Sequence, residues 1–423
     1  MNVVLGAGMA GLGVYCSKHD VEIFEKEDTY GGLCGNFVIE CNGNFIFDKA
    51  VHLSFTNDET VRLIFDQNDY ITYQPIPYSW YKEQWLQHPA QSNLYPLGID
   101  EKISAIKGFV ERPISTNNPD NFEDWTISQY GYYLYENMFK PYNEKYWCTD
   151  LKELGVDWLG GRFYLPTIDE VLYGSYTDKT PNTYYAKEMR YPPKGGYKAF
   201  LSKLAGDAEE NGKIHYHMEA KEIDIGKKIV RFSDGKQIKY SQLYTSIPLP
   251  DMFNIIKNVP SELKDMANSL EWTKIALVSI GFDKVFEAKN IWYYIYDRDI
   301  MAARAHMPSM KSAYNVPFGC SSIQFEVYFN SKETLMDESK VVNNCIDSLE
   351  KMKIATREDI LFSDYRVIPY GNVIFKKDTQ KTVSLLKEWL IANDIIPIGR
   401  FGKWEYLWSD QAFKTGYDAS NGL

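Results

Sequence analysis

The alternation of apolar and polar positions predicts a strand, a helix and a second strand at the start of the chain. Residues 3–5 are apolar and lead into the pattern Gly-x-Gly-x-x-Gly at residues 6–11, and a second strand is predicted at Val21-Glu22-Ile23-Phe24-Glu25. A short strand that ends in this glycine pattern is typical of a turn that points a helix N-terminus at a pyrophosphate. The pattern therefore predicts a unit that binds a dinucleotide.

Three glycines and one acid carry this prediction. Gly6 allows the tight turn, Gly8 leaves space where the phosphates approach, and Gly11 lets the helix pack on its strand. Glu25 ends the second strand, where a carboxylate accepts hydrogen bonds from the hydroxyls of a ribose. A glycine-rich turn beside a surface glutamate is the alternative, but the order of strand, helix and acid favours a binding site.

A second glycine-rich turn follows, and it contains Gly31, Gly32 and Leu33. An NAD dehydrogenase has no need of this second turn, whereas flavoproteins that bind FAD in an extended conformation place small residues there. We therefore expect FAD rather than NAD. Residues 45–51 then lead into His52, and the sequence leaves open whether His52 is a structural residue or a neighbour of the isoalloxazine ring.

The later segments predict further domains. Residues 98–146 have apolar positions three and four apart, which is typical of helices, whereas apolar runs between residues 271 and 330 suggest an antiparallel sheet. We expect an α/β fold with an FAD-binding Rossmann-like domain, an inserted helical domain and an antiparallel-sheet substrate domain. The expected boundaries are 1–75, 193–252 and 394–423 for the FAD-binding domain, 76–150 for the helical insertion, and 151–192 with 253–393 for the substrate domain.

Length, charge and cysteine spacing restrict the partners. A chain of 423 residues exceeds one simple core, so two or three domains are expected. The net charge of -11 argues against nucleic acid or an anionic membrane as the main partner, so an anionic ligand needs a local group of arginines. The six cysteines lack disulfide or metal spacing, and no apolar run is long enough to span a membrane. We therefore expect a cytoplasmic protein with reduced thiols and no metal.

Several longer motifs resemble one family in collinear order over nearly the whole chain. They are residues 85–93 (WLQHPAQSN), 141–147 (PYNEKYW), 191–196 (YPPKGG), 292–294 (WYY) and 399–406 (GRFGKWEY), together with Arg162 and Arg304. In these segments the chain is similar to the flavin-dependent UDP-galactopyranose mutases, and it is nearer to the eukaryotic type. The motifs are more specific than the dinucleotide pattern, which many amine oxidases share.

This resemblance implies which residues form the site. Arg162 and Arg304 match arginines that clamp the substrate diphosphate, which suits the planar fork of a guanidinium, and His52 matches a histidine close to the flavin. The other residues that match substrate-binding positions are His88, Gln91, Asn143, Trp147, Tyr294, Tyr370, Tyr406 and Asp410. The residues that match cofactor-binding positions are Gly6, Gly8, Gly11, Glu25, Gly31, Gly32, Leu33, Arg400 and Gln411.

The resemblance also implies a reaction. The chain would interconvert the pyranose and furanose forms of a nucleotide-diphosphate sugar such as UDP-galactose, a step toward galactofuranose and polysaccharide biosynthesis. In the family, N5 of reduced FAD attacks the anomeric carbon, the diphosphate leaves and returns, and no net redox occurs. NADH or NADPH is the candidate reductant, and a homo-oligomer stays open. The alternatives are an amine-oxidase-like or desaturase-like FAD oxidoreductase and a non-catalytic flavin-binding protein.

Five positions depart from the family pattern. Ala50 and Val51 stand where the family has glycines before the loop histidine, so the loop is expected to be stiffer. His88 and Ala90 replace aromatic residues beside the nucleotide base, and Asp410 replaces an asparagine near the substrate. The sequence therefore leaves the sugar and the base open.

Overall fold

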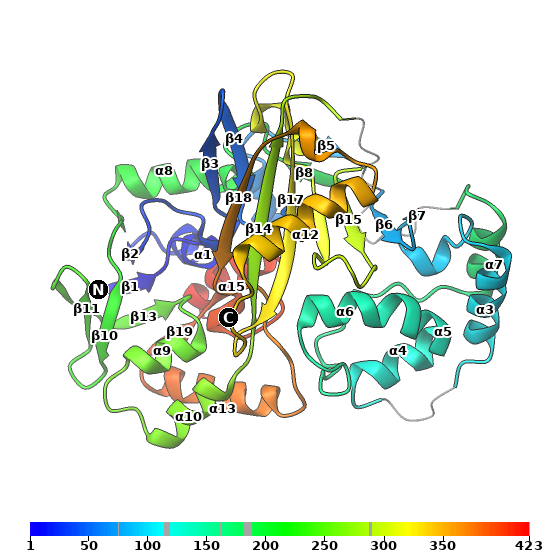
Figure 1. The fold of residues 1–423 in the computed structure, drawn as a ribbon. Helices are drawn as coiled ribbons and strands as arrows, with labels where there is room; N and C mark the ends of the chain where they lie inside the picture. The colour runs from blue at the N-terminus through cyan, green and yellow to red at the C-terminus, as the bar shows by residue number, and fades with distance from the viewer. Residues whose placement is uncertain (75, 114–118, 161, 181–187, 287–289, 423) are drawn as a thin grey trace.

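Two large sheets and a group of helices make up the molecule. The structure is a computed structural model that describes residues 1–74, 76–113, 119–160, 162–180, 188–286 and 290–422. In Figure 1 a parallel sheet lies on the left, a long antiparallel sheet stands at the centre, and the helices of residues 99–176 lie on the right. The α/β fold expected from the sequence is confirmed.

The parallel sheet joins strands from distant parts of the chain. Its strands, in the order β19, β13, β1, β2, β9, are β19 (Ile395–Pro397), β13 (Gln242–Thr245), β1 (Asn2–Leu5), β2 (Val21–Phe24) and β9 (Ile214–His215). Parallel sheets are covered on both faces, which explains why Val3, Val4 and Leu5 of β1 are apolar at successive positions. The first glycine turn follows β1 at the centre of this sheet, as the sequence predicts.

Two helices that are far apart in sequence pack closely on this sheet. Helix α1 (Met9–Ser17) contacts helix α15 (Ser409–Asn421) through glycines on both sides. A Cβ atom on Gly13 would lie 2.1 Å from the Phe413 carbonyl oxygen, and one on Gly416 would lie 1.9 Å from the Ala10 carbonyl oxygen. The last helix of the chain therefore depends on glycine to lie against the first.

The central sheet has seven strands, and its two faces differ. The strands, in spatial order, are β18 (Ile360–Ile368), β14 (Thr273–Phe282), β17 (Ser321–Asn330), β16 (Arg304–His306), β15 (Trp292–Ile295), β6 (Tyr78–Tyr81) and β7 (Gln84–Gln87). Neighbouring strands are antiparallel except for the pair β15 and β6. The odd-numbered side chains of β17 from Ile323 to Phe329 are apolar and pack in one core with helix α12 (Glu338–Lys351). The even-numbered side chains of β17 are polar and face the other way.

The helices on the right of Figure 1 begin at Ile99, in agreement with the helical periodicity from residue 98 onward. They are α3 (Ile99–Val110), α4 (Phe122–Tyr130), α5 (Tyr132–Leu134), α6 (Lys140–Trp147) and α7 (Ile168–Tyr176), with a π-helical turn at Tyr135–Phe139. The segment expected as a helical insertion, 76–150, instead starts with β6 and β7, which belong to the central sheet. Their hairpin turns at Lys82 and Glu83, which both have positive φ (46° and 62°) without the glycine or asparagine that usually signals such a turn.

Shorter elements complete the fold. The remaining helices are α2 (Glu59–Phe65), α8 (Ser202–Glu210), α9 (Leu249–Ile255), α10 (Ser261–Ser269), α11 (Pro308–Lys311), α13 (Thr379–Ala392) and α14 (Gly399–Gly402). The remaining strands are β3 (Asn36–Glu40) paired with β4 (Asn44–Asp48), β5 (Ile71–Tyr73) paired with β8 (Met189–Tyr191), and a small sheet of β10 (Ala220–Asp224), β11 (Ile229–Phe232) and β12 (Gln237–Lys239).

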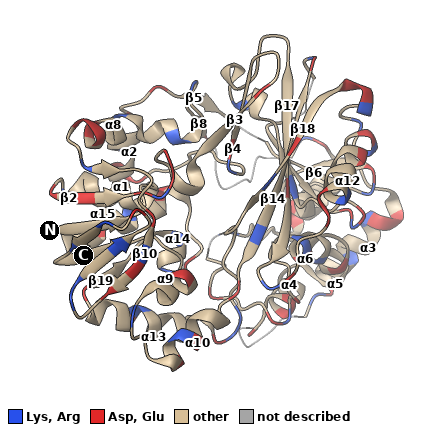
Figure 2. Cartoon of the chain, turned by 60° about the vertical axis from the view of Figure 1, so that its left-hand side comes forward, with Lys and Arg blue, Asp and Glu red and all other residues tan. Residues whose placement is uncertain are grey.

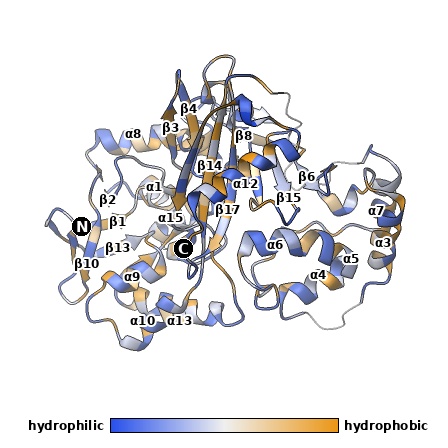
Figure 3. Cartoon of the chain, in the orientation of Figure 1, coloured by the Kyte–Doolittle hydropathy of each residue, from blue (hydrophilic) through white to orange (hydrophobic). Residues whose placement is uncertain are grey.

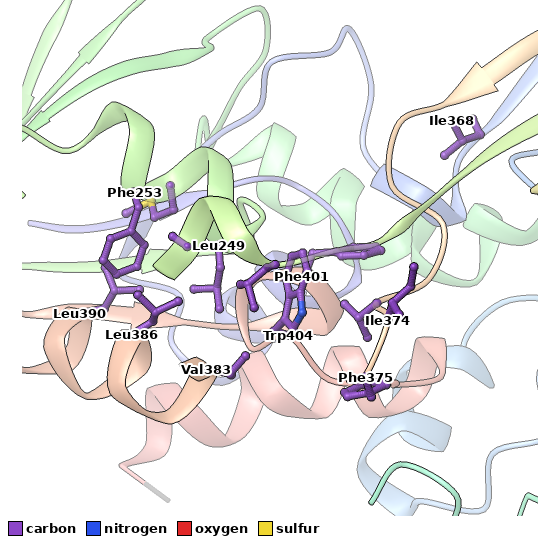
Figure 4. Close-up of a cluster of buried hydrophobic side chains, with 14 of the residues drawn as sticks. Leu249, Phe253, Ile368, Ile374, Phe375, Val383, Leu386, Leu390, Phe401 and Trp404 are labelled. Atoms are coloured by element: carbon purple, nitrogen blue, oxygen red, sulfur yellow. The ribbon is translucent and has the colours of Figure 1, made fainter. Parts of the chain in front are cut away.

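A buried apolar cluster joins the parallel sheet to the C-terminal part of the chain. Figure 4 shows Phe253 of α9 against Leu390 and Leu386 of α13, with Phe401 and Trp404 beside them. All five side chains are buried. This packing fixes α14 and the turn that follows it, which carry Arg400 and Tyr406 of the expected site.

The surface is mixed in charge. Figure 2 shows acidic and basic residues interspersed on the outer helices, and Figure 3 shows hydrophobic positions along the strands and on one side of α12. Within the part of the chain that the structure describes, no helix is long and apolar enough to cross a membrane.

The close approach of α1 and α15 predicts a stability effect. Gly416→Ala places a methyl group against the Ala10 carbonyl, so we expect it to lower the free energy of unfolding by about 1–3 kcal/mol. Gly206→Ala in α8 is the matched control, because nothing lies within 4 Å of a Cβ there, and it should stabilise the protein by about 0.5–1 kcal/mol. Urea unfolding followed by circular dichroism measures both. A Gly416→Ala protein as stable as the wild type would contradict the packing.

Candidate functional site

The first glycine turn is closely packed against its surroundings. A Cβ atom on Gly11 would lie 1.9 Å from the Gly6 carbonyl oxygen, and one on Gly6 would lie 2.3 Å from Ser246 Oγ. The buried carboxylate of Glu25 accepts the Ala7 N–H (2.7 Å) and the Glu27 N–H (3.0 Å), one on each oxygen. Glu25 thus holds the turn in place, and each carboxylate oxygen keeps a lone pair for another donor.

The second glycine turn lies directly against the first. Gly31 N–H donates to the Ala7 carbonyl oxygen (2.9 Å), and a Cβ atom on Gly32 would lie 3.3 Å from Gly8 Cα. Gly31 has a φ of +112°, which favours glycine at that position. Gly8 is the N-cap of α1, so the two turns leave main chain without side chains at a helix N-terminus. This arrangement fits the pyrophosphate of a dinucleotide.

His52 lies beside the second turn. Its Nε2 is 3.1 Å from both the Leu33 and the Lys49 carbonyl oxygens, and its ring stacks on Tyr197 with centroids 5.2 Å apart. Carbonyl oxygens only accept hydrogen bonds, so Nε2 carries the proton. Burial lowers the pKa of His52, so the ring is neutral at pH 7 and Nδ1 is left as an acceptor.

The two arginines expected to clamp a diphosphate are connected through two tyrosines. The Arg162 guanidinium lies over the Tyr406 ring, with Cζ 5.0 Å from the ring centroid, and Nη2 donates to the Tyr406 carbonyl oxygen (2.6 Å). The Arg304 guanidinium lies over the Tyr146 ring at 5.1 Å. The hydroxyls of Tyr146 and Tyr406 are 2.7 Å apart. Arg162 and Arg304 therefore belong to one aromatic cluster, which we call the arginine–tyrosine cluster.

A third arginine joins this cluster. The Arg400 guanidinium also lies over Tyr406, at 5.2 Å, and it donates to the carbonyl oxygens of Leu407 (Nε, 2.8 Å) and Gly371 (3.2 Å). Main-chain carbonyls hold this guanidinium without neutralising it. The result is a concentration of positive charge in an otherwise acidic protein.

A buried carboxylate that sequence reasoning missed accompanies Arg304. Glu326 of β17 is fully buried, and its Oε2 accepts a hydrogen bond from Arg304 Nε (2.8 Å) and from the Tyr328 hydroxyl. Arg304 Nη2 also donates to the Tyr328 hydroxyl (2.8 Å), whereas Nη1 has no partner among the described residues. The signal for Glu326 and Tyr328 was the strict alternation of polar and apolar residues in β17.

More buried polar atoms lie on the same face of the central sheet. Both ring nitrogens of His306, Oε1 of Gln324 and Oγ of Ser322 have no hydrogen-bond partner within the described ranges. Burial lowers the pKa of His306, so its ring is neutral. Buried polar groups usually have partners, so these atoms can accept or donate further hydrogen bonds.

Three more of the expected substrate residues, His88, Tyr294 and Trp147, take part in aromatic contacts around the cluster. Tyr294 stacks on His88, with centroids 4.4 Å apart, and contacts Tyr142, which packs on Tyr146. Trp147 is buried 5.3 Å from the Tyr406 ring. These residues therefore continue the arginine–tyrosine cluster toward His88.

Two more of the expected substrate residues are buried amides. Gln91 donates to the Tyr164 carbonyl oxygen (3.3 Å), and Asn143 of α6 donates to the Phe139 carbonyl oxygen (2.8 Å). The amide nitrogen of each side chain thus donates one hydrogen bond to the main chain.

Three expected site residues do not join the arginine–tyrosine cluster. Tyr370 stacks on Trp272 (4.6 Å), and its pKa is raised by burial and by Asp251, to which it donates a hydrogen bond. Asp410 and Gln411 lie in the first turn of α15, where Gln411 accepts the Trp408 N–H (3.0 Å). They line a cavity of about 570 Å³ whose lining contains none of the three arginines. The resemblance gives Tyr370 a role at the diphosphate, Asp410 a role at the substrate and Gln411 a role at the cofactor, and these roles stay predictions.

Comparison with known proteins first gives a class. Residues 4–67 match the NAD(P)-binding Rossmann-like domain family, so the chain contains a dinucleotide-binding domain of this class. The whole chain superposes on a crystal structure of reduced UDP-galactopyranose mutase with a TM-score of 0.93 and 23% sequence identity, covering 99% of this chain and 93% of that chain. The fold is therefore that of UDP-galactopyranose mutase, and the resemblance found in the sequence is confirmed at the level of the fold.

Two other similar proteins are named as oxidases. The chain is 24% identical over 180 residues to protoporphyrinogen oxidase of Dictyostelium discoideum, a match that covers 41% of this chain and 31% of that protein. It thus spans less than a third of that relative. A putative protoporphyrinogen oxidase of Exiguobacterium superposes with a TM-score of 0.71 and 12% identity over 100% of this chain and 98% of that chain. The fold is shared with a putative oxidase, so the chemistry of this chain has to be argued from the site.

A buried lysine in α6 predicts that the free energy of unfolding depends on pH. Lys145 Nζ donates to the carbonyl oxygens of Asp297 (3.0 Å), Ile300 (3.1 Å) and Ala302 (3.0 Å), and so attaches α6 to the turn between β15 and β16. Burial lowers the pKa of Lys145 from 10.5 to about 7. Between these values the unfolded chain holds more protons than the folded chain, so the stability contributed through this group rises with pH and is lost as pH falls toward 7.

Lys145→Met removes this titration and tests the sign. We expect the free energy of unfolding of the wild type, relative to the variant, to increase between pH 7 and pH 10. Urea unfolding at several pH values measures the difference. If the two stability curves run parallel over this range, Lys145 does not titrate as the structure indicates.

Proposed function

We propose that the chain is a flavin-dependent mutase that interconverts the pyranose and furanose forms of a nucleotide-diphosphate sugar. The arginine–tyrosine cluster is the observation that carries this proposal. Arg162, Arg304 and Arg400 all lie over the rings of Tyr146 or Tyr406, within the fold of UDP-galactopyranose mutase. Arginines concentrated in this way are suited to a diphosphate that leaves and returns.

FAD is the cofactor that the two glycine turns fit. The N-terminus of α1 and the main chain at Gly8, Gly31 and Gly32 would hold its pyrophosphate, and Glu25 would accept the ribose hydroxyls. Reduced flavin supplies a nucleophilic nitrogen for the anomeric carbon of a sugar. NADH or NADPH is the reductant that we propose.

The residues of the chain bind and orient the substrate. The arginines keep their charge when buried, so they would stabilise the diphosphate as its bond to the sugar breaks. The hydroxyls of Tyr294 and Tyr406 would donate hydrogen bonds to it, and Tyr146, linked to Tyr406, would keep that hydroxyl in place. His88, stacked on Tyr294, would lie against the nucleotide base. Holding the departing diphosphate close would favour its return to the sugar over its loss to water.

Tyr370 and Asp410 lie outside the arginine–tyrosine cluster, so their roles in substrate binding carry a further condition. Tyr370 lies against Trp272 and Asp251 rather than in the cluster, so a role in diphosphate binding requires it to move. Asp410, in the first turn of α15, would lie near the sugar only if the substrate extends toward the cavity that it lines.

A true FAD oxidoreductase is the second candidate, because part of the chain matches protoporphyrinogen oxidase. Such an enzyme oxidises its substrate, for example by removing a hydride, and has no need of several arginines around two tyrosines. The two functions differ in their use of oxygen, and this difference gives a direct test.

The first prediction for the reaction concerns the redox state. Protein reduced with dithionite should convert UDP-galactopyranose to UDP-galactofuranose or act on a related nucleotide sugar, whereas oxidised protein should be inactive. Chromatography of the nucleotide sugars and an oxygen electrode follow product and oxygen together. Oxygen consumption in step with substrate loss would favour the oxidoreductase instead.

The second prediction concerns the arginines. Arg162→Ala and Arg304→Ala should each lower kcat by about 100-fold or more, because each removes a charged donor to the departing anion. Both variants should keep FAD, measured by the flavin absorbance of the purified protein. Arg357→Ala is the control, since Arg357 is exposed and pairs with Asp347 on the surface. Loss of FAD from either test variant would contradict the assignment of that arginine to the substrate.

A further inference from the structure

Glu326 contacts two parts of the candidate site at once. Its Oε1 accepts the Val51 N–H (2.8 Å), and its Oε2 accepts Arg304 Nε (2.8 Å) and the Tyr328 hydroxyl. Val51 directly precedes His52, so one buried carboxylate connects the histidine loop with an arginine of the cluster. We call residues 48–52 the histidine loop.

The carboxylate is ionised and firmly held. Burial raises the pKa of Glu326, but the Arg304 charge, the Tyr328 hydroxyl and the Val51 N–H lower it more, so the net pKa is below its usual range. A buried charge of this kind is stable only with its partners in place. The positions of Val51 and Arg304 are therefore linked, because the buried carboxylate of Glu326 accepts hydrogen bonds from both.

The other end of the histidine loop is fixed by a second buried ion pair. Lys311 Nζ lies 2.5 Å from Asp48 Oδ2, and both side chains are fully buried. Asp48 also accepts hydrogen bonds from the Tyr191 hydroxyl (2.8 Å) and the Tyr197 N–H (2.9 Å). Arg304 and Lys311 lie in one short segment that runs from β16 into α11, so the same segment supplies both cations.

The conformation of the loop is strained and needs such support. Ala50 has a φ of +81°, in the left-handed region that non-glycine residues seldom adopt. The Val51 N–H that follows it is held by Glu326. The loop therefore keeps its shape because its two ends are bonded, and Glu326 holds the end nearest His52.

We propose that Glu326 is a positioning residue that couples the histidine loop to Arg304, so that binding of a diphosphate at Arg304 makes the loop more ordered. The proposal rests on the proposed function in one respect, namely that Arg304 binds the diphosphate. Coupling of this kind is reciprocal, so a change at Glu326 has to appear both in anion affinity and in loop order.

Glu326→Gln is the central variant, because the amide keeps the size of the side chain and an oxygen acceptor but loses the charge. We expect the Kd for UDP to rise by about 10-fold or more, since a hydrogen-bonded charge partner of Arg304 is lost. The Kd for uridine should stay the same. Isothermal titration of the FAD-bound protein measures both. Tighter UDP binding would mean that Glu326 only offsets the charge of Arg304, and would overturn the proposal.

Hydrogen exchange gives the second readout, which needs no activity. In the wild type, UDP should slow amide exchange in a peptide that covers residues 48–53, and in Glu326→Gln this effect of UDP should disappear. Glu358→Gln, at an exposed position, should behave like the wild type in both assays. If UDP protects the loop equally in the wild type and in Glu326→Gln, the coupling does not run through Glu326.

A milder variant covers the case in which Glu326→Gln does not fold. Tyr328→Phe removes one hydroxyl that contacts both Glu326 and Arg304 but leaves both charges, so it should change both readouts in the same direction and to a smaller extent. Unchanged UDP affinity and unchanged loop protection in this variant would count against the coupling.

Failure of the proposed function can be recognised separately. If the wild type binds neither UDP nor another nucleoside diphosphate, the proposed function is wrong. Arg304→Ala then tests the coupling alone, because loss of the Glu326 partner should speed exchange of the loop without any ligand. Unchanged exchange in Arg304→Ala would overturn the coupling.

Discussion

The burial of positive charge among aromatic rings is the constraint on which the site depends. Guanidinium groups from three distant segments lie over Tyr146 and Tyr406, and these rings give a cation a favourable surface inside the protein. Arg162 and Arg400 donate to main-chain carbonyl oxygens, and Arg304 is paired with Glu326. The protein therefore holds these charges in place before any anion arrives, which is the condition for electrostatic catalysis.

The fold brings these segments together from distant parts of the chain. Arg304 comes from a strand of the central sheet, Tyr146 from α6, and Arg400 and Tyr406 from the segment between the last strand and the last helix of the parallel sheet. Close packing of α1 against α15 through Gly13 and Gly416 and the apolar cluster around Phe401 and Trp404 fix that last segment (Figure 4). A putative protoporphyrinogen oxidase has a similar fold, so the arginines rather than the scaffold distinguish the proposed chemistry.

Much of the fold could be predicted from local sequence signals, whereas the internal connections of the site could not. The glycine pattern at the start of α1, the apolar run in β14 and the alternation of polar and apolar residues in β17 are encoded in adjacent residues. The β6–β7 hairpin was missed because Lys82 and Glu83 adopt positive φ without a typical turn sequence. The contact of Glu326 with Val51 joins residues 275 positions apart, and it depends on sheet register, which one sequence does not reveal. Tyr370 was expected near the diphosphate, but its packing against Trp272 depends on the same kind of long-range contact.

The most direct test is a crystal structure of the reduced, FAD-bound protein with UDP. The account predicts that oxygens of the diphosphate lie within hydrogen-bond distance of the guanidinium groups of both Arg162 and Arg304, with the uracil ring toward His88. A diphosphate bound elsewhere, for example beside Lys403 and Lys414 in the cavity lined by Asp410, would contradict the account.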